Sequence, residues 1–276
     1  AIYGDYESNC KPYAKQTIPT DFICFTNNND IEPNEWDVDS HPYHETNPSA
    51  FDDGLYLNSL KNNHHTFNLA KYYKQSFHNI PRLKDYDVVV WLDGTKEITH
   101  PKAAEWIVNK IELNPIITWE HRDRKGSLKA EVDESISLIK YSSEFWFNQP
   151  QPFQKIQAQY QAYIQDDYNE DLWPTIDPER KNSGVWDTGF VAFNNQNNEI
   201  HRFLDLWYLQ TLKHSTQDQV GFPYAVQKLH LYPYTLPDSS IKGDFDGNYL
   251  FIKHYHKTQK LGSLTFKRDP AHASLN

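Results

Sequence analysis

The segment Asp87–Gly94 (DVVVWLDG) constrains the fold more than any other part of the sequence. Its apolar run is long enough for a strand that is buried on both faces, and Asp93 and Gly94 end it. Such strands are typical of sheets that helices cover on either side. The segment therefore predicts a central strand of an α/β domain that brings a carboxylate to one edge of the sheet.

Apolar runs and amphipathic stripes alternate along the rest of the chain, which predicts a largely parallel sheet covered by helices. We expect further strands at Ala1–Tyr3, Asp21–Thr26, Trp36–Asp39, Ile116–Trp119, Phe190–Phe193 and Leu250–Tyr255. We expect helices at Thr66–Phe77, Pro101–Leu113, 128–140, 151–166, around Ile200–Thr211, and from a capping-box pattern at Thr216–Gln219 to Leu229. The stretch Asp171–Lys181 is expected to be an irregular loop. No linker divides the chain, so residues 1–276 are expected to form one domain.

Composition narrows the classes of partner. The aromatic content of 15% excludes a disordered chain, and the net charge of −10 argues against nucleic acid or an anionic membrane as the main partner. We expect no membrane span, because no run of 18 apolar residues exists, and a cytoplasmic location, or a lumenal one if the sequence is a trimmed domain. Cys10 and Cys24 do not make a disulfide framework, and Cys24 is expected to be a small buried hydrophobic residue.

Three loops are expected to meet at the ligand-binding edge of the sheet, because ligands of open α/β sheets bind where the strands end at their carboxyl edge. These loops are Gly4–Tyr6, Thr26–Asp30 and Asp93–Thr95. Asp93 follows the apolar run directly, and there it could hold a divalent ion that neutralises a diphosphate. The alternative is a strand-ending aspartate that caps the next turn. The residues by themselves leave both interpretations open.

Several short motifs occur in an order that is similar to a known family. They are Tyr3–Glu7, Cys24–Asn27, Ala70–Lys74 with Phe77–His78, Asp85–Asp87 with Trp91–Gly94, His121–Arg124, and Asp218–Pro223. Together they resemble a glycosyltransferase-like family that includes plant mucilage-related and turgor-regulation-defect proteins and bacterial relatives. The resemblance implies a glycosyltransferase-A fold, which is a Rossmann-related, mostly parallel central sheet flanked by helices. It also implies a nucleotide-sugar donor and a divalent cation, Mn or Mg.

Within this fold, we expect residues 1–125 to form the nucleotide-sugar-binding half and residues 126–276 the acceptor-side half with a C-terminal tail. Lysines can neutralise a diphosphate, and the family carries basic residues at the positions of Lys71 and Lys74. On a solvated helix face, such lysines are usually without a special role. The expected donor-binding residues are Tyr3, Gly4, Thr26, Asn27, Lys71, Lys74, Asp93 and Gly94.

The chain departs from the usual Asp-x-Asp motif of glycosyltransferase-A enzymes, because Thr95 stands where the second carboxylate would be. Related folds commonly place a metal-binding histidine near the C-terminus, and His254 and His256 follow a late strand here. The expected metal ligands are therefore Asp93, His254 and His256, and imidazole favours Mn over Mg. The alternative for either histidine is an ordinary surface or core residue.

The segment Gly184–Phe190 is the expected acceptor side, because Trp186 can present a stacking ring beside the hydrogen-bonding groups of Asp187 and Thr188. The alternative is a β-bulge with a buried tryptophan. Arg124 could hold a phosphate or an acidic acceptor.

Asp218 is the expected catalytic base, since an inverting transferase needs a carboxylate to take the proton of the acceptor hydroxyl. Asp93, with or without a metal, and nearby basic residues are expected to stabilise the departing diphosphate. A first-turn aspartate is also a routine helix cap, and the helix dipole lowers its pKa.

The sequence thus predicts a hexosyl- or pentosyltransferase that moves a sugar from a nucleotide-diphosphate donor, with a UDP-sugar favoured, to a glycan or other hydroxyl. A glycoside hydrolase would need two carboxylates straddling the bond, and a carbohydrate-binding module is usually smaller and all-β. Both remain alternatives.

Overall fold

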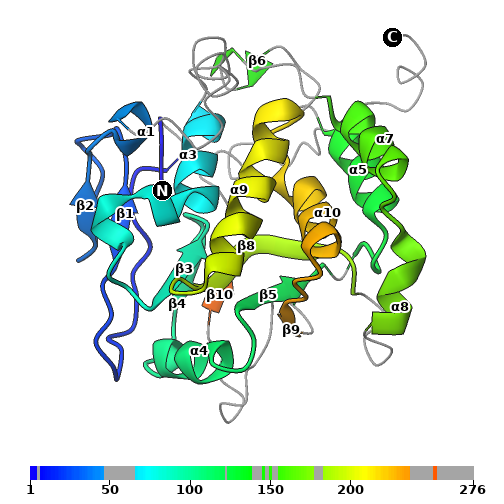
Figure 1. Cartoon of the computed structure of the whole chain (residues 1–276). Helices are drawn as coiled ribbons and strands as arrows, with labels where there is room; N and C mark the ends of the chain where they lie inside the picture. Colours follow the sequence, from blue (N-terminus) through cyan, green and yellow to red (C-terminus); the bar gives the residue numbers. More distant parts are fainter. Residues whose placement is uncertain are drawn as a thin grey trace.

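The structure of the chain is a computed structural model, which describes residues 1–4, 7–46, 66–121, 123–138, 145–146, 149–150, 155–176, 183–236 and 251–253 (Figure 1). It is a mixed α/β structure. The strands are β1 Ile23–Phe25, β2 Asp37–Asp39, β3 Val88–Leu92, β4 Lys96–Ile98, β5 Ile116–Glu120, β6 Phe145–Trp146, β7 Gln149–Pro150, β8 Trp186–Asn194, β9 Tyr234–Leu236 and β10 Phe251–Lys253. The helices are α1 Tyr43–Thr46, α3 Thr66–Gln75, α4 Ala103–Ile111, α5 Leu128–Ser137, α7 Ile156–Gln165, α8 Trp173–Ile176, α9 Asn198–Lys213 and α10 Asp218–Leu229, with 3-10 turns η1 Phe77–Asn79, η2 Pro81–Leu83 and η3 Glu170–Leu172.

The main sheet has four strands in the order β3-β8-β5-β9. Strand β8 is antiparallel to both β3 and β5, whereas β5 and β9 are parallel. The prediction of mostly parallel pairing is therefore wrong for β8, although β3, β5 and β9 point the same way. An apolar run looks the same in either direction, so the hydrophobic pattern alone does not fix the direction of a strand.

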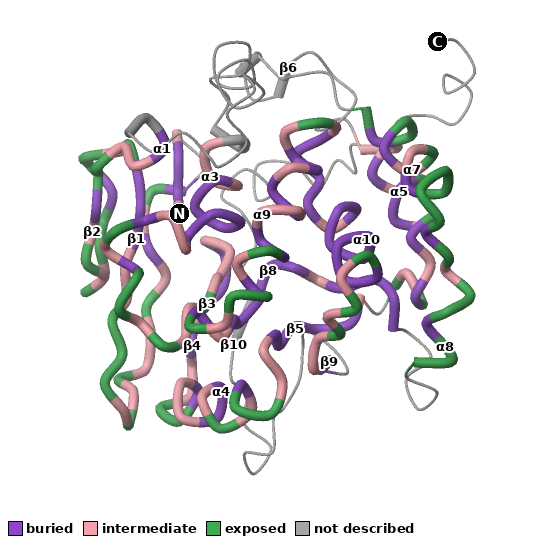
Figure 2. Tube along the Cα trace, in the orientation of Figure 1, coloured by how far each residue is buried: buried purple, intermediate pink, exposed green. Residues whose placement is uncertain are grey.

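Both faces of this sheet are buried by helices. Alternate residues of a strand point to opposite faces, so Ile116, Val191 and Phe193 enter the core that α3, α9 and α10 also form. Ile117 and Ala192 enter the second core, which α4 covers. Figure 2 shows β8 and much of α9 and α10 as buried. The expected covering of a central sheet by helices is confirmed.

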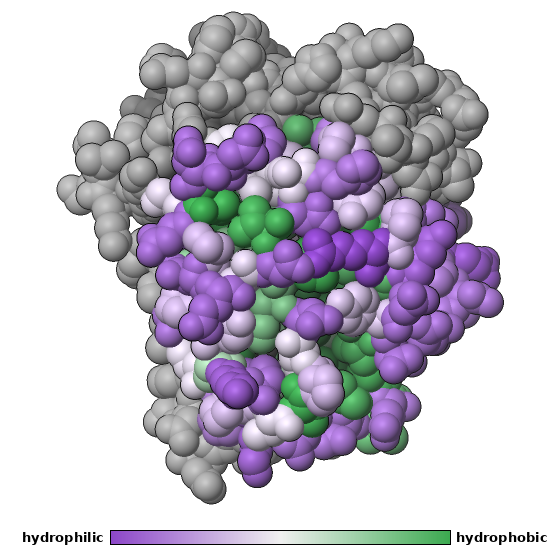
Figure 3. All heavy atoms as spheres, turned by 90° about the vertical axis from the view of Figure 1, so that its left-hand side faces the viewer, coloured by the Kyte–Doolittle hydropathy of each residue, from purple (hydrophilic) through white to green (hydrophobic). Residues whose placement is uncertain are grey.

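The N-terminal residues form a separate small layer beside the sheet. Strands β1 and β2 pair in parallel, and Ile2 forms an isolated parallel bridge with Thr26 instead of the full strand predicted for Ala1–Tyr3. On the side of the molecule where β1 and β2 lie, hydrophilic residues predominate and hydrophobic ones show as separate patches (Figure 3). In the part of the chain that the structure describes, every helix is too short or too polar to cross a lipid bilayer.

Three local predictions are corrected. Strand β8 begins at Trp186 rather than Phe190. Helix α10 begins at Asp218, and its N-cap Gln217 makes no side-chain cap hydrogen bond, so the capping box predicted at Thr216–Gln219 does not form. The segment Asp171–Lys181 holds the end of η3 and all of α8, which packs through the buried Trp173. Burial of that ring outweighs the loop-forming tendency of the nearby prolines.

Candidate functional site

Asp93 stands at the carboxyl end of β3, where the sequence placed it. Its backbone N–H donates a 2.9 Å hydrogen bond to the carbonyl of Gly189 on β8, which ties the end of β3 to the neighbouring strand. The indole N–H of Trp91 donates to Oδ1 of Asp93 over 2.8 Å. The side chain of Asp93 is still 47% exposed. The strand end thus holds a carboxylate in a fixed orientation with an open side.

Helix α3 brings two lysines to this edge from the other side. Lys71 and Lys74 lie on the same face of the helix, three residues apart. Nζ of Lys71 lies 2.6 Å from Oδ1 of Asp218, and Lys74 forms an ion pair with Oδ2 of the same carboxylate. The Lys74 ammonium also lies 5.5 Å from the ring centroid of Trp91 and 5.6 Å from that of Trp207. Aromatic faces and a carboxylate therefore stabilise a lysine that is almost completely buried.

Asp218 is the buried counter-ion of these lysines, and its side chain is only 5% exposed. The hydroxyl of Thr188 donates to Oδ2 of Asp218 over 3.1 Å and accepts a hydrogen bond from Nζ of Lys74. Burial alone would raise the pKa of Asp218, but the charges and hydrogen bonds of Lys71 and Lys74 outweigh it and lower the pKa. The carboxylate is therefore enclosed and paired with two lysines, and its role as the catalytic base stays a prediction.

A second set of charges meets Asp93 beside Gly189. A Cβ atom at Gly189 would lie 2.7 Å from Cε of Lys96 and 2.9 Å from a carboxylate oxygen of both Asp93 and Asp187, so a larger residue there would displace the ends of these side chains. Nζ of Lys96 lies 3.8 Å from Oδ2 of Asp187 and 4.8 Å from the ring centroid of Trp119. Six charged side chains thus converge at one edge of the sheet. We call them the Asp–Lys cluster: Asp93, Asp187, Asp218, Lys71, Lys74 and Lys96.

The electrostatics of the cluster keep Asp93 ionised. Burial would raise its pKa, but the ammonium groups of Lys74, Lys71 and Lys96, together with the N–H of Trp91, hold the pKa well below its ordinary value. The nearest of these ammonium groups, that of Lys74, lies 4.0 Å from Oδ1 of Asp93. The open side of the carboxylate can accept hydrogen bonds from hydroxyl groups.

The sequence reasoning missed three members of this site: Trp91, Lys96 and Gly189. Each adjoins a residue that it did select, since Trp91 precedes the end of β3, Lys96 follows the Asp93–Thr95 loop and Gly189 follows Thr188. A lysine directly after a strand-end loop was a usable signal. The close packing of charged side chains against Gly189 could not be predicted from the sequence, because it depends on strand pairing.

Four other predicted donor-binding residues are engaged by neighbouring residues of the fold. The N–H of Gly4, which has a φ of +64°, donates to Oδ1 of Asn27 over 2.8 Å. The buried hydroxyl of Thr26 accepts a hydrogen bond from the backbone N–H of Asn28. Tyr3 is 5% exposed and stacks on another tyrosine ring in the core. We call Tyr3, Gly4, Thr26 and Asn27 the N-terminal turn. Its hydrogen bonds fix the path of the chain.

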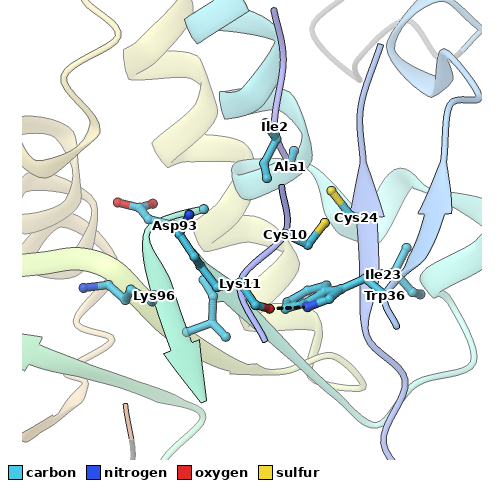
Figure 4. Close-up of a pocket in the computed structure, with 11 residues that line it drawn as sticks. Ala1, Ile2, Cys10, Lys11, Ile23, Cys24, Trp36, Asp93 and Lys96 are labelled. Carbon is cyan, nitrogen blue, oxygen red and sulfur yellow. Dashed lines mark hydrogen bonds between the residues drawn. The ribbon is translucent and has the colours of Figure 1, made fainter. Parts of the chain in front are cut away.

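An open pocket lies between the Asp–Lys cluster and the N-terminal layer (Figure 4). Asp93, Gly94 and Lys96 line one side of it, and Lys11 and Trp36 belong to the N-terminal layer. It is a small pocket with a cavity volume of about 30 Å³. Gly94 lies against Ile2, because a Cβ atom there would come within 3.1 Å of Cγ1 of Ile2.

The structure places the predicted acceptor residues in two different environments. Trp186 is 2% exposed, and its indole N–H donates to the hydroxyl of Thr235, so its ring belongs to the core and does not stack on a ligand. The β5–β8 register shifts opposite this segment, which agrees with the alternative of a bulge and a buried tryptophan. Asp187 and Thr188 join the Asp–Lys cluster and its hydrogen bonds.

Arg124 belongs to a separate polar group, since its Nε lies 2.6 Å from the buried Glu131. Gln217 and Gln219, which flank Asp218, donate to the same Glu131 carboxylate. The start of α10 therefore contacts both groups.

The described residues do not fit a divalent cation. Within the ranges that the structure describes, no three His, Cys, Asp or Glu side chains lie together as metal ligands. Asp93 and Asp187 meet at Gly189, but each has a lysine ammonium within 4.0 Å, where a cation would compete with it. His254 and His256 lie outside the described residues, so their predicted role as ligands stays a prediction.

No protein-family model matches the chain, and no curated protein matches it. Among solved structures, it is similar to the apo structure of a bifunctional glycosyltransferase, WbbM, with 13% sequence identity and a TM-score of 0.33. The match covers 62% of this chain and 24% of that chain, so the chain spans about a quarter of its structural neighbour. A likeness at this level assigns neither a family nor an activity, so the function is inferred from the site.

Proposed function

We propose that the chain is a glycosyltransferase of the glycosyltransferase-A type that moves a hexosyl or pentosyl group from a nucleotide-diphosphate sugar, with a UDP-sugar favoured, to a hydroxyl group of a glycan. One observation carries the proposal. Asp93 presents a half-exposed carboxylate at the carboxyl edge of the sheet, among three lysines whose ammonium groups the fold holds in place. The hydroxyl groups of a sugar diphosphate would donate hydrogen bonds to this carboxylate, and its anionic oxygens would bind the ammonium groups.

In this proposal the lysines stabilise the departing diphosphate. Lys74 and Lys96 are almost completely buried, so their attraction to a phosphate oxygen is stronger than it would be in water. The phosphates would take over part of the contacts that Asp93 and Asp187 now make with these two lysines. Positive charge that is fixed before the reaction needs no reorganisation as the leaving group gains charge.

Asp93 would accept hydrogen bonds from sugar hydroxyls, and Trp91 would orient it. Asp218 is a positioning residue, because it sets the places of Lys71 and Lys74 without an open face of its own. We retain residues 1–125 as the donor half and residues 126–276 as the acceptor half. Binding of a divalent cation, Mn or Mg, would depend on His254 and His256, and the roles proposed for the other residues do not involve it.

The experiment is a thermal-shift panel with UDP, GDP and CMP, each with and without Mn, on the wild-type chain and on Lys96→Met. Stabilisation of the wild type by one nucleoside diphosphate, reduced in Lys96→Met, is the expected result. Stabilisation by free oligosaccharide with no response to any nucleotide would overturn the proposal and favour a hydrolase or a carbohydrate-binding protein.

A further inference from the structure

The only two cysteines of the chain lie side by side in the N-terminal layer. Cys24 is on β1, and Cys10 is on the preceding segment, in one small core cluster with Ile2 and Ile31. Figure 4 shows their sulfur atoms pointing toward each other. Both are free thiols.

The backbone holds Cys10 in place on both sides. Its N–H donates a 2.9 Å hydrogen bond to the carbonyl of Glu32, and its carbonyl accepts a 2.7 Å hydrogen bond from the side chain of Asn34. Cys24 is held by the β1–β2 pairing, where it lies opposite Val38. The sulfur atoms are therefore brought together by fixed segments.

The two thiols have unequal chemistry. The contact between the two thiols lowers the pKa of Cys24 against the opposing effect of burial. The same contact, reinforced by burial, raises the pKa of Cys10. One sulfur can thus react as a thiolate while its neighbour holds a proton, which is the arrangement of a nucleophilic and a resolving cysteine.

Small molecules can reach the pair through the open pocket. Both cysteines line the same pocket as Asp93 and Lys96 (Figure 4). The residues themselves are almost completely buried, which excludes bulky thiol reagents but not a molecule of the size of a peroxide.

We propose that Cys10 and Cys24 form an oxidation site at which hydrogen peroxide converts two thiols into one intramolecular disulfide. The thiolate of Cys24 attacks one peroxide oxygen, the O–O bond breaks, and protonation of the departing hydroxide gives water and a sulfenic acid on Cys24. The sulfur of Cys10 then attacks the sulfenic sulfur, the S–O bond breaks, and a second water leaves with the proton of Cys10. Overall two thiols lose two electrons and two protons to one peroxide, which becomes two waters. The site does not depend on the proposed transferase activity.

The test treats the folded wild-type chain with hydrogen peroxide, removes the oxidant, alkylates the denatured product and measures its intact mass. The expected main product is a monomer that has lost two hydrogen atoms and takes up no alkyl group. A dithiol reductant should then restore two alkylatable thiols. The variants Cys10→Ser and Cys24→Ser are matched controls, and neither can give this product. In Cys10→Ser, the sulfenic acid on Cys24 should accumulate and appear as a mass gain of one oxygen atom.

Three results would overturn the inference. The wild-type thiols could both stay alkylatable, the disulfide could join two chains, or the same product could form equally fast in urea, where the folded contact is lost. Because the wild type itself is the main sample, the test remains decisive even if a cysteine variant fails to fold. A loss of nucleotide binding would not bear on the result, so the failure of this inference and that of the proposed function are separable.

Discussion

Asp93 of the Asp–Lys cluster and the loops of the N-terminal turn were selected by the same rule, that ligands bind where strands end, yet the two regions differ in what their polar groups do. The cluster leaves Asp93 half-exposed among lysines that come from α3 and from β4. In the turn, Gly4 is bonded to Asn27, and the hydroxyl of Thr26 accepts a hydrogen bond from its own loop. A place at the edge of the sheet is therefore insufficient. A binding site also needs charged or polar groups that the fold itself does not use up.

The largest effect is expected for Lys74→Met. Removal of one partner of a buried pair leaves Asp218 with Lys71 alone in a site of low polarity, which should reduce the free energy of unfolding by about 3–5 kcal/mol. The matched control is Lys129→Met, whose ion pair with Asp133 is exposed and should contribute about 1 kcal/mol or less. Urea unfolding measures both, and equal losses in the two variants would show that the cluster is no more tightly coupled than the surface.

Asp93→Asn should affect activity more than stability. We expect the transferase kcat/KM to fall about 100-fold, the scale of losing one oriented polar group in an active site, with little change in the unfolding midpoint because the side chain is half-exposed. Asp37→Asn is the control, since that exposed carboxylate is paired with Arg82 away from the cluster. Unchanged kcat/KM in Asp93→Asn would remove Asp93 from the site.

The pH dependence of stability should distinguish Asp218 from a solvent-exposed carboxylate. The pKa of Asp218 is lowered in the folded chain, whereas in the unfolded chain it is about 3.9. The stabilisation by Asp218 is therefore complete above the unfolded pKa and is lost as the pH falls through the lower folded pKa. Urea unfolding of wild type and Asp218→Asn should show a constant difference from about pH 7 to about pH 5, which shrinks toward about pH 3. A difference that grows on acidification would contradict the pairing with the lysines.

The smallest effect is expected in the N-terminal turn. Asn27→Ala removes the acceptor of the Gly4 N–H and should cost about 1 kcal/mol of unfolding free energy, with nucleotide affinity unchanged. Calorimetric titration and urea unfolding of the same sample check both parts. Loss of nucleotide affinity with full stability would restore the turn as a donor-binding region.

Much of the fold followed from hydrophobic patterning. Val88–Leu92 and Ile116–Glu120 are strands as the apolar runs predicted, and the stripe around Ile200–Thr211 is the buried face of α9. Val88–Leu92, however, is the outermost strand in the order of the main sheet and only partly buried, so its predicted central position is wrong. These hydrophobic patterns indicate which residues of a helix or strand are buried. They do not indicate the direction of a strand, so the antiparallel course of β8 was missed. The short strand β9 was missed as well, because three residues carry too little periodicity.

The site was predicted in its components but not in its contacts. Lys71, Lys74, Asp93 and Asp218 were all selected, and the structure brings them together. Their pairing joins residues 147 positions apart, which no spacing rule reveals. For that reason the sequence did not reveal that Asp218 is the ion-pair partner of two lysines. The burial of Trp186 depends in the same way on its neighbours in space.

The most direct test of the central claim is calorimetric titration of UDP into wild type, Lys96→Met and Asn27→Ala. Lys96 is buried over Trp119, and methionine keeps the packing of its stem while removing the charge. We expect at least about tenfold weaker binding to Lys96→Met, the scale of one charge-assisted hydrogen bond, and wild-type affinity for Asn27→Ala. Equal affinities for wild type and Lys96→Met, with binding lost in Asn27→Ala, would contradict the claim.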